Sequence, residues 1–297
     1  MPKSWIVENK VCKGDELELT PKGNHLIVST DKPAEKSEIS IDVTGLDRTS
    51  ILLHIRSAYR KGHDTIELKY SEPYTKHLRT NEKKKVSSII HNEVSRLVGV
   101  EVIQQKENSC IIKSISQSSP DDFTSIIRRI FILVNDLAKD VDKGYKDSNF
   151  AILDTVMEKH DTITKFISYC LRLLNKTNNG TIKNRIDLYY TISALENIID
   201  VLKWGGRRSM KLEGKKFDKR TSEIITKIMN SVSIYYDMFY KFDKLKVGKM
   251  YQNRHEAFLL MQNHLTKLPI EQAIIVNEQA QVLNHIVSLT ERKLIDF

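Results

Sequence analysis

The stretch Ser116-Gln117-Ser118-Ser119-Pro120-Asp121-Asp122 divides the chain into two parts of different character. Small polar residues are followed by a proline and two acids, and both proline and acidic residues are favoured in the first turn of a helix. After this stretch the sequence predicts only helices, whereas before it strand and helix patterns alternate. The fold class is therefore predicted to be mainly α, with a β-containing part in front.

Six long amphipathic segments follow the boundary. Apolar residues recur in them at helical spacing, and they are separated by residues that break helices. Their approximate ranges are 121–143, 148–176, 182–207, 218–246, 248–267 and 270–296, and the separating residues are Gly144, Asn178-Asn179-Gly180, Gly205-Gly206 with Gly214, Gly248 and Pro269. Long helices joined by short loops pack as antiparallel neighbours. We therefore expect a double three-helix bundle over 119–297, with repeats at 121–207 and 218–296.

The third segment carries an acidic pair. In Ala194-Leu195-Glu196-Asn197-Ile198-Ile199-Asp200 the two carboxylates lie four residues apart, and so stand one above the other on one helix face. Like charges at this spacing repel each other by about 0.2–0.5 kcal/mol unless a cation or basic residue lies between them. The pair has two interpretations, a counter-ion site or a solvated face, and the spacing alone favours the solvated face. Asp136 and Asp140 repeat the spacing on the first segment, where exposed acids are again favoured.

Residues 39–117 predict a small α/β unit with the order β-α-β-α-β-β. Strands are expected near 39–43, 65–68, 100–105 and 109–115, and helices near 47–61 and 82–98. The run Lys83-Lys84-Lys85 is interpreted as the solvated start of the second helix rather than as a nucleic-acid site, because short charge runs usually only solvate a surface.

Residues 1–38 predict a short helix followed by a β-hairpin. Pro2 suits the first turn of a helix, and Lys13-Gly14-Asp15 is a turn signal before the alternating residues Leu17 and Leu19. A second turn at Pro21-Lys22-Gly23-Asn24 leads into a further apolar strand.

Composition limits the classes of protein that fit. The 297 residues suggest two or three domains, and Cys12, Cys110 and Cys170 have no spacing typical of disulfides or zinc sites, so a reducing cytoplasm is expected. No apolar run is long enough for a membrane span. The net charge of +9 fits an acidic partner, although residues 1–38 are the least basic part. The sequence contains no GxSxG, P-loop, HExxH or paired CxxC motif, so an enzyme is not expected.

Two families resemble parts of this sequence. The first 38 residues resemble a partial swapped-hairpin module of the SpoVT/AbrB type, with an "LPKxW" helix and a "KGDExE" strand; the chain begins at the proline of that motif, and the strand before it is not in the sequence. The helix with Glu196 and Asp200 resembles the "LERIGD" helix of the PhoU family, regulators of phosphate uptake built from two three-helix repeats. Together the parts look like an archaeal-type fusion of the two modules.

The PhoU resemblance implies metal ligands on the first repeat. Glu196 and Asp200 match the family's carboxylate pair, and Asp161 keeps one acid of the second-helix cluster, with His160 and Glu158 beside it as further candidate ligands. Iron, zinc, manganese or magnesium is the implied ion. In the second repeat the matching stretch 283–288 has lost both carboxylates, and His255 and Glu256 are the nearest remnants, so no metal is expected there.

The resemblance also implies the function. We expect a cytoplasmic, PhoU-like regulator of phosphate uptake that contacts a phosphate transporter ATPase or a regulator protein. The alternative is an AbrB-type transcription regulator that binds DNA through the N-terminal module and uses the bundle as a sensor. At least a dimer is expected, because half of a swapped hairpin leaves strand edges unpaired.

Overall fold

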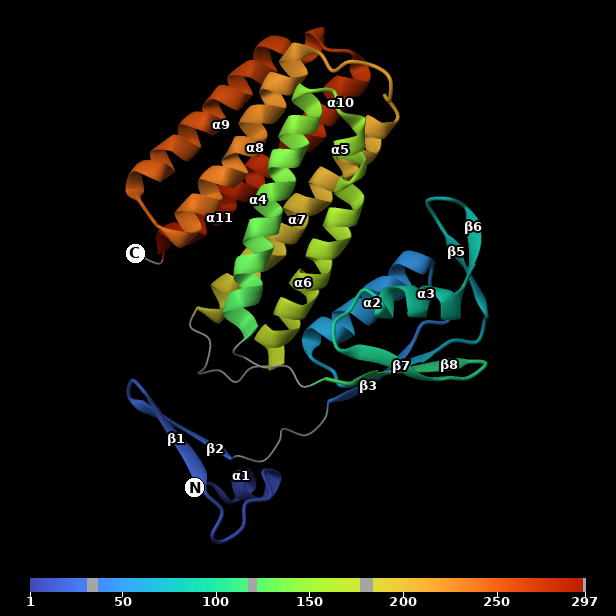
Figure 1. Cartoon of the computed structure of the whole chain (residues 1–297). Coiled ribbons are helices and arrows are strands. Elements are labelled where there is room, and N and C mark those ends of the chain that lie inside the picture. Colours follow the sequence, from blue (N-terminus) through green and yellow to red (C-terminus); the bar gives the residue numbers. More distant parts are fainter. Residues whose placement is uncertain (31–36, 117–121, 177–183, 296–297) are drawn as a thin grey trace.

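The computed structural model describes residues 1–30, 37–116, 122–176 and 184–295 (Figure 1). These residues leave out most of the predicted boundary before the helical part. They also leave out the predicted break at Asn178-Asn179-Gly180. A small helix and hairpin come first, an α/β domain follows, and a bundle of long helices makes up the rest. The predicted fold class, mainly α with a β-containing part in front, is confirmed.

The N-terminal part is a short helix and one β-hairpin, as the turn signals predict. Helix α1 (Lys3–Glu8) precedes strands β1 (Leu17–Lys22) and β2 (His25–Thr30), which pair antiparallel from Leu17 opposite Thr30 to Lys22 opposite His25.

The α/β domain is a four-stranded sheet in the order β3-β4-β8-β7, with α2 and α3 packed together on one face (Figure 1). Its elements are β3 (Glu38–Asp42), α2 (Arg48–Lys61), β4 (Thr65–Lys69), α3 (Val86–Val94), β7 (Val100–Gln105) and β8 (Ser109–Ser114). Strands β3 and β4 are parallel because α2 carries the chain back between them, and β8 and β7 continue the sheet antiparallel. Apolar side chains of both helices and of the sheet form a separate core, which includes Ile51, Ile55, Ile66, Leu68, Ile90 and Ile112.

A second hairpin interrupts this domain where the sequence predicts a helix. Strands β5 (Tyr74–His77) and β6 (Glu82–Lys85) pair with each other and with no strand of the main sheet. The predicted helix over 82–98 is therefore wrong in its first turn, since α3 starts at Val86. The lysine run belongs to β6, and Lys85 is the N-cap of α3.

Two three-helix units build the bundle. Its elements are α4 (Asp122–Lys146), α5 (Phe150–Asp154), α6 (Val156–Lys176), α7 (Arg185–Met210), α8 (Lys219–Tyr240), α9 (Lys244–His264), the short 3₁₀ helix η1 (Leu265–Lys267), α10 (Ile270–Gln279) and α11 (Gln281–Ile295). Helices α4, α6 and α7 pack together, as do α8, α9 and α11, and the units join where α4 meets α8 and α7 meets α11 (Figure 1).

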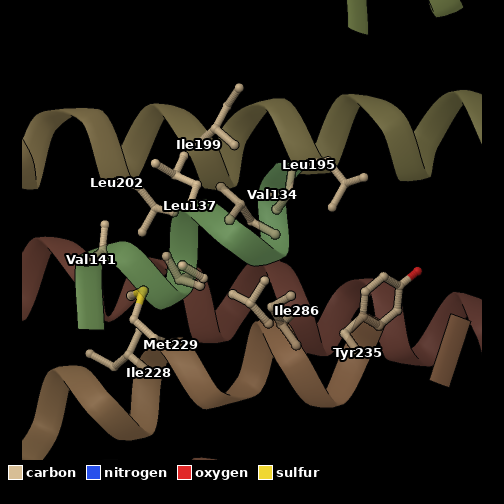
Figure 2. Close-up of a cluster of buried hydrophobic side chains, with 14 of the residues drawn as sticks. Val134, Leu137, Val141, Leu195, Ile199, Leu202, Ile228, Met229, Tyr235 and Ile286 are labelled. Atoms are coloured by element: carbon tan, nitrogen blue, oxygen red, sulfur yellow. The ribbon is translucent and has the colours of Figure 1, made fainter. Parts of the chain in front are cut away.

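One hydrophobic core fills the space between the units. Figure 2 shows side chains of α4, α7, α8 and α11 meeting there, with Val134, Leu137, Val141, Leu195, Ile199, Leu202, Ile228, Met229, Tyr235 and Ile286 labelled. Each of these residues is almost completely buried. In the described parts of the chain, no helix has the length and apolarity needed to cross a membrane.

Several glycines that are predicted to separate helices lie inside helices instead. Gly205 permits close packing of α7 on α10, because a Cβ there would lie 2.1 Å from Nε2 of the fully buried Gln279. Gly144 similarly faces Leu153, and Gly248 lies in the first turns of α9 with open space around it. The start of α9 is instead set by Asp243, whose carboxylate accepts a hydrogen bond from the Leu245 amide.

Candidate functional site

The acidic pair of the third segment lies on α7, and its first acid, Glu196, contacts an arginine of the α/β domain. Arg60, in the last turn of α2, donates hydrogen bonds from both terminal nitrogens to the Glu196 carboxylate, at 2.8 Å and 2.5 Å. It also donates to the Ser168 hydroxyl on α6, at 3.0 Å from Nη2. The side chains of Arg60 and Glu196 are only 18% and 15% exposed. Bidentate pairs of this kind are among the stronger hydrogen bonds in proteins.

The second acid of the pair belongs to a small network with α6. Each ring nitrogen of the buried His160 lies 2.9 Å from a carboxylate oxygen, Nδ1 from Asp161 and Nε2 from Asp200. Lys203 forms an ion pair with Asp200, and Arg96, which follows α3, forms one with Asp161. We call Asp161, Glu196 and Asp200 the acidic face; all three carboxylates are paired with lysine or arginine.

The electrostatics of Asp200 reflect these partners. Burial acts to raise its pKa, but hydrogen bonds from His160 and Lys203 outweigh burial and lower the pKa to about 2. The pKa of Asp161 is also lowered, since His160 and Arg96 together outweigh burial. Both carboxylates are therefore held in the charged form at neutral pH.

A buried arginine on α6 adds a second set of contacts between the domains. Arg172 is 1% exposed, and its Nη1 donates to the carbonyl oxygens of Tyr59 and His63, both at 2.8 Å. Its Nη2 donates to the Asp64 carboxylate at 3.1 Å, and Lys176 forms an ion pair with the same carboxylate. The last carbonyl groups of a helix have no partner within the helix, so Arg172 satisfies groups at the C-terminal end of α2.

The C-terminal end of α2 packs closely against α6. Gly62 has φ 102°, a left-handed conformation that favours glycine, and a Cβ on it would lie 2.9 Å from Cγ of Lys176. Beside it, the Asn175 amide donates to the Arg60 carbonyl oxygen at 2.8 Å. We call this set of contacts between α2 and helices α6 and α7 the interdomain joint.

The fifth predicted ligand lies elsewhere. Glu158 lines an open groove of about 570 Å³ between α4 and α6, together with Asp136 and Asp140. Lys159 in the same groove forms an ion pair with Asp140. The structure thus brings His160, Asp161 and Asp200 together, places Glu196 one turn of α7 from Asp200, and places Glu158 at the groove between α4 and α6.

This arrangement does not supply a ligand set for a metal ion. Both ring nitrogens of His160 already have partners: Nδ1 lies beside Asp161, and Nε2 lies beside both Asp200 and the Lys203 ammonium, which is 3.1 Å away. The positive charge that a cation would supply already comes from Arg60, Arg96 and Lys203. Across the described ranges, no group of three or more His, Cys, Asp or Glu side chains has the geometry to hold a metal. The metal prediction for iron, zinc, manganese or magnesium stays a prediction.

Glu256, one of the two remnants in the second repeat, is also engaged. Glu256 on α9 forms a 2.5 Å ion pair with Lys227 on α8 and accepts a hydrogen bond from Gln252. Burial lowers the pKa of His285 on α11.

The sequence prediction misses the cations of the joint. One signal for them is present: Arg172 interrupts the otherwise apolar run Tyr169-Cys170-Leu171-Arg172-Leu173-Leu174, and a guanidinium on a buried helix face needs partners. Its partners, however, are more than 100 positions away in sequence, and no local pattern identifies them.

The low pKa of Asp200 predicts an acid-dependent loss of stability. A carboxyl group whose pKa is lower in the folded chain than its ordinary 3.8 stabilises the fold above about pH 4, and this stabilisation is lost as the pH falls toward 2. Asp200→Asn should therefore have a lower urea midpoint than the parent at pH 7, and the difference should shrink toward pH 2. Asp154→Asn, at an exposed position on α5, serves as the control. A difference that is independent of pH would contradict the assignment.

Comparisons with known proteins give limited similarity. No family model and no curated protein matches the chain. Among solved structures, PhoU from Pseudomonas aeruginosa is similar at 17% identity and a TM-score of 0.47, covering 59% of this chain and 94% of its own. The phosphate transport system regulatory protein PhoU from Streptococcus pneumoniae is similar at 14% identity and a TM-score of 0.45, covering 59% and 93%.

Proposed function

We propose that the chain is a PhoU-like regulator of phosphate uptake that acts in the cytoplasm by contact with a phosphate transporter ATPase or a regulator protein. The observation that carries the proposal is the pair of three-helix units around one filled core, the architecture that the sequence resemblance implies. With the core filled by apolar side chains, the bundle offers a partner the outer faces of its helices.

The outer face of α9 is the contact surface that we propose. Helix α9 buries Met250, Asn253, Ala257 and Met261. On its opposite side Leu245, Tyr251 and Leu259 are 68%, 39% and 43% exposed. Tyrosine is enriched among the anchors of protein interfaces, and exposed apolar residues grouped on one surface mark interaction sites.

Phosphate uptake in cells tests this proposal. Cells of the source organism that lack the gene should take up more radiolabelled phosphate in phosphate-rich medium than parent cells, because the restraint on the transporter is lost. The wild-type gene should restore the restraint, and a Tyr251→Ser/Leu259→Ser variant should fail to do so while remaining folded. Leu53→Ser/Ile103→Ser, which changes two exposed apolar residues of the α/β domain, is the matched control and should restore it.

Either of two results would contradict the proposal. Uptake that does not change when the gene is deleted would remove the regulatory role. Full restoration by the α9 variant would keep a regulatory role but assign the contact to another surface.

A further inference from the structure

The hairpin of β5 and β6 is an arm that projects from the α/β domain (Figure 1). All four residues of β6 are exposed, so this strand adds nothing to the hydrophobic core. Residues 74–85 contain a single acid, Glu82, against the basic residues Lys76, Arg79, Lys83, Lys84 and Lys85. We call this hairpin the basic ribbon.

Its register places three lysines on one side. Lys76 lies opposite Lys83, and Tyr74 lies opposite Lys85. Side chains of directly opposed residues share a face, and residues two apart along a strand do as well. Tyr74, Lys76, Lys83 and Lys85 therefore form one face, which we call the lysine face. The acid Glu82 belongs to the other face.

The charge on the lysine face is not neutralised within the chain. Like charges directly opposite each other destabilise a strand pair. Within the part of the chain that the structure describes, no ion pair involves Lys76, Lys83 or Lys85, whereas Lys84 on the other face pairs with Glu82 at 2.8 Å. Tyr74, opposite Lys85, is 56% exposed. Such a face is complementary to an anionic partner.

The surroundings of the ribbon add positive charge. Arg48 at the start of α2 and three lysines of the ribbon line a hollow beside β6, together with the buried His77. Burial, followed by the charges of Arg48, Arg79 and Lys84, lowers the pKa of His77, which is the effect expected in a positive field.

Two acids lie near the lysine face, fewer than its three lysines, and within the described residues neither forms an ion pair with them. Asp47 and Glu72 line the groove between the lysine face and the loop that precedes α2. The Asp47 carboxylate accepts hydrogen bonds from the Thr49 amide and the Ser50 hydroxyl and keeps its negative charge, and Glu72 is exposed.

We propose that the lysine face binds duplex DNA, with Lys76, Lys83 and Lys85 at the phosphates and Tyr74 against the sugars. A two-stranded ribbon fits the major groove of B-form DNA, which is about 12 Å wide, whereas the deep and narrow major groove of A-form RNA excludes side chains. Phosphate contacts carry no sequence information, so the binding is independent of sequence. This proposal stands independently of the regulatory function proposed above, because it uses another domain and another partner.

Salt-dependent binding of the full chain to labelled duplex DNA tests the proposal. Fluorescence anisotropy between 50 and 200 mM salt should give affinities that fall steeply with salt, with a log–log slope of roughly −0.9 for each phosphate neutralised. The Lys76→Ala/Lys83→Ala/Lys85→Ala variant should bind more weakly to every sequence, and its slope should be smaller in magnitude by about 2.7, which corresponds to three contacts.

A matched variant separates the ribbon from net charge. Lys211→Ala/Lys215→Ala/Lys216→Ala removes three exposed lysines from the connection between α7 and α8, the densest basic patch of the sequence. It should retain the parent's affinity and slope. The unfolding midpoint of the ribbon variant should equal or exceed that of the parent, because a like-charge pair has been removed.

Three outcomes would overturn the proposal. If the ribbon variant binds like the parent, the lysine face makes no contact with DNA. If both variants lose affinity equally, net charge alone accounts for binding. If duplex RNA binds as tightly as DNA, or inorganic phosphate displaces the DNA at equal ionic strength, the site recognises a different anion.

Discussion

Replacing Arg172 by methionine should lower the free energy of unfolding of the full chain by about 3–5 kcal/mol. The guanidinium is buried and donates to the Tyr59 and His63 carbonyl groups and to the Asp64 carboxylate. Methionine fills a similar volume but donates nothing, so the His63 carbonyl loses this donor and the Tyr59 carbonyl keeps only the Gly62 amide. The Asp64 carboxylate, which is 16% exposed, loses one of two cations. The effect should be largest at the joint between the α/β domain and the bundle.

Urea unfolding and hydrogen exchange measure this effect together. The unfolding free energy should fall by the stated amount, and amides at the C-terminal end of α2 should exchange faster in the variant. Arg129→Met, which replaces an exposed arginine of α4, is the matched control and should change stability by less than about 0.5 kcal/mol. A loss below about 1 kcal/mol, with exchange at α2 unchanged, would mean that the contacts of Arg172 do not stabilise the joint.

Reversing the charge of Arg60 should be the next most damaging change. Arg60→Glu places a carboxylate at the position from which Arg60 now contacts Glu196, in a region where both side chains are less than one-fifth exposed. Loss of one partner of a buried pair destabilises by about 3–5 kcal/mol, and repulsion between two carboxylates adds to this, although partial exposure reduces both effects.

The exchanged pair provides the test. Arg60→Glu/Glu196→Arg restores opposite charges and should recover part of the lost unfolding free energy, whereas each single reversal should be destabilised. Lys61→Glu changes the charge of an exposed neighbour on α2 by the same amount and should have little effect. An exchanged pair that is less stable than both single variants would show that Arg60 and Glu196 do not face each other.

Local sequence patterns predict the long helices of the bundle and the point where the helical part begins. Amphipathic periodicity predicts the long helices, and the Asp-rich boundary predicts where the helical part begins, because both signals depend on neighbouring residues. The same rules err where packing overrides local preference. Gly205 predicts a helix end, but α7 continues through it. A glycine is needed there because α10 packs too closely for any larger side chain.

The candidate site is the part that local patterns predict least well. The spacing of Glu196 and Asp200 alone favours a solvated face, whereas the structure pairs both carboxylates with cations. The identity of the cation is decided by Arg60, which is 136 residues away and belongs to another domain. The basic ribbon is missed for a related reason: the lysine run resembles a helix start until β5, eight residues earlier, is recognised as its partner strand.

The most direct test of the account is a double-mutant cycle of Arg60→Ala and Glu196→Ala, measured by urea unfolding of the full chain in the presence of a metal chelator. We predict a coupling free energy of about 1–3 kcal/mol that does not change when iron, zinc, manganese or magnesium replaces the chelator. A coupling near zero, together with a metal-dependent stabilisation that Glu196→Ala abolishes, would contradict the account and assign the acidic face to a metal ion.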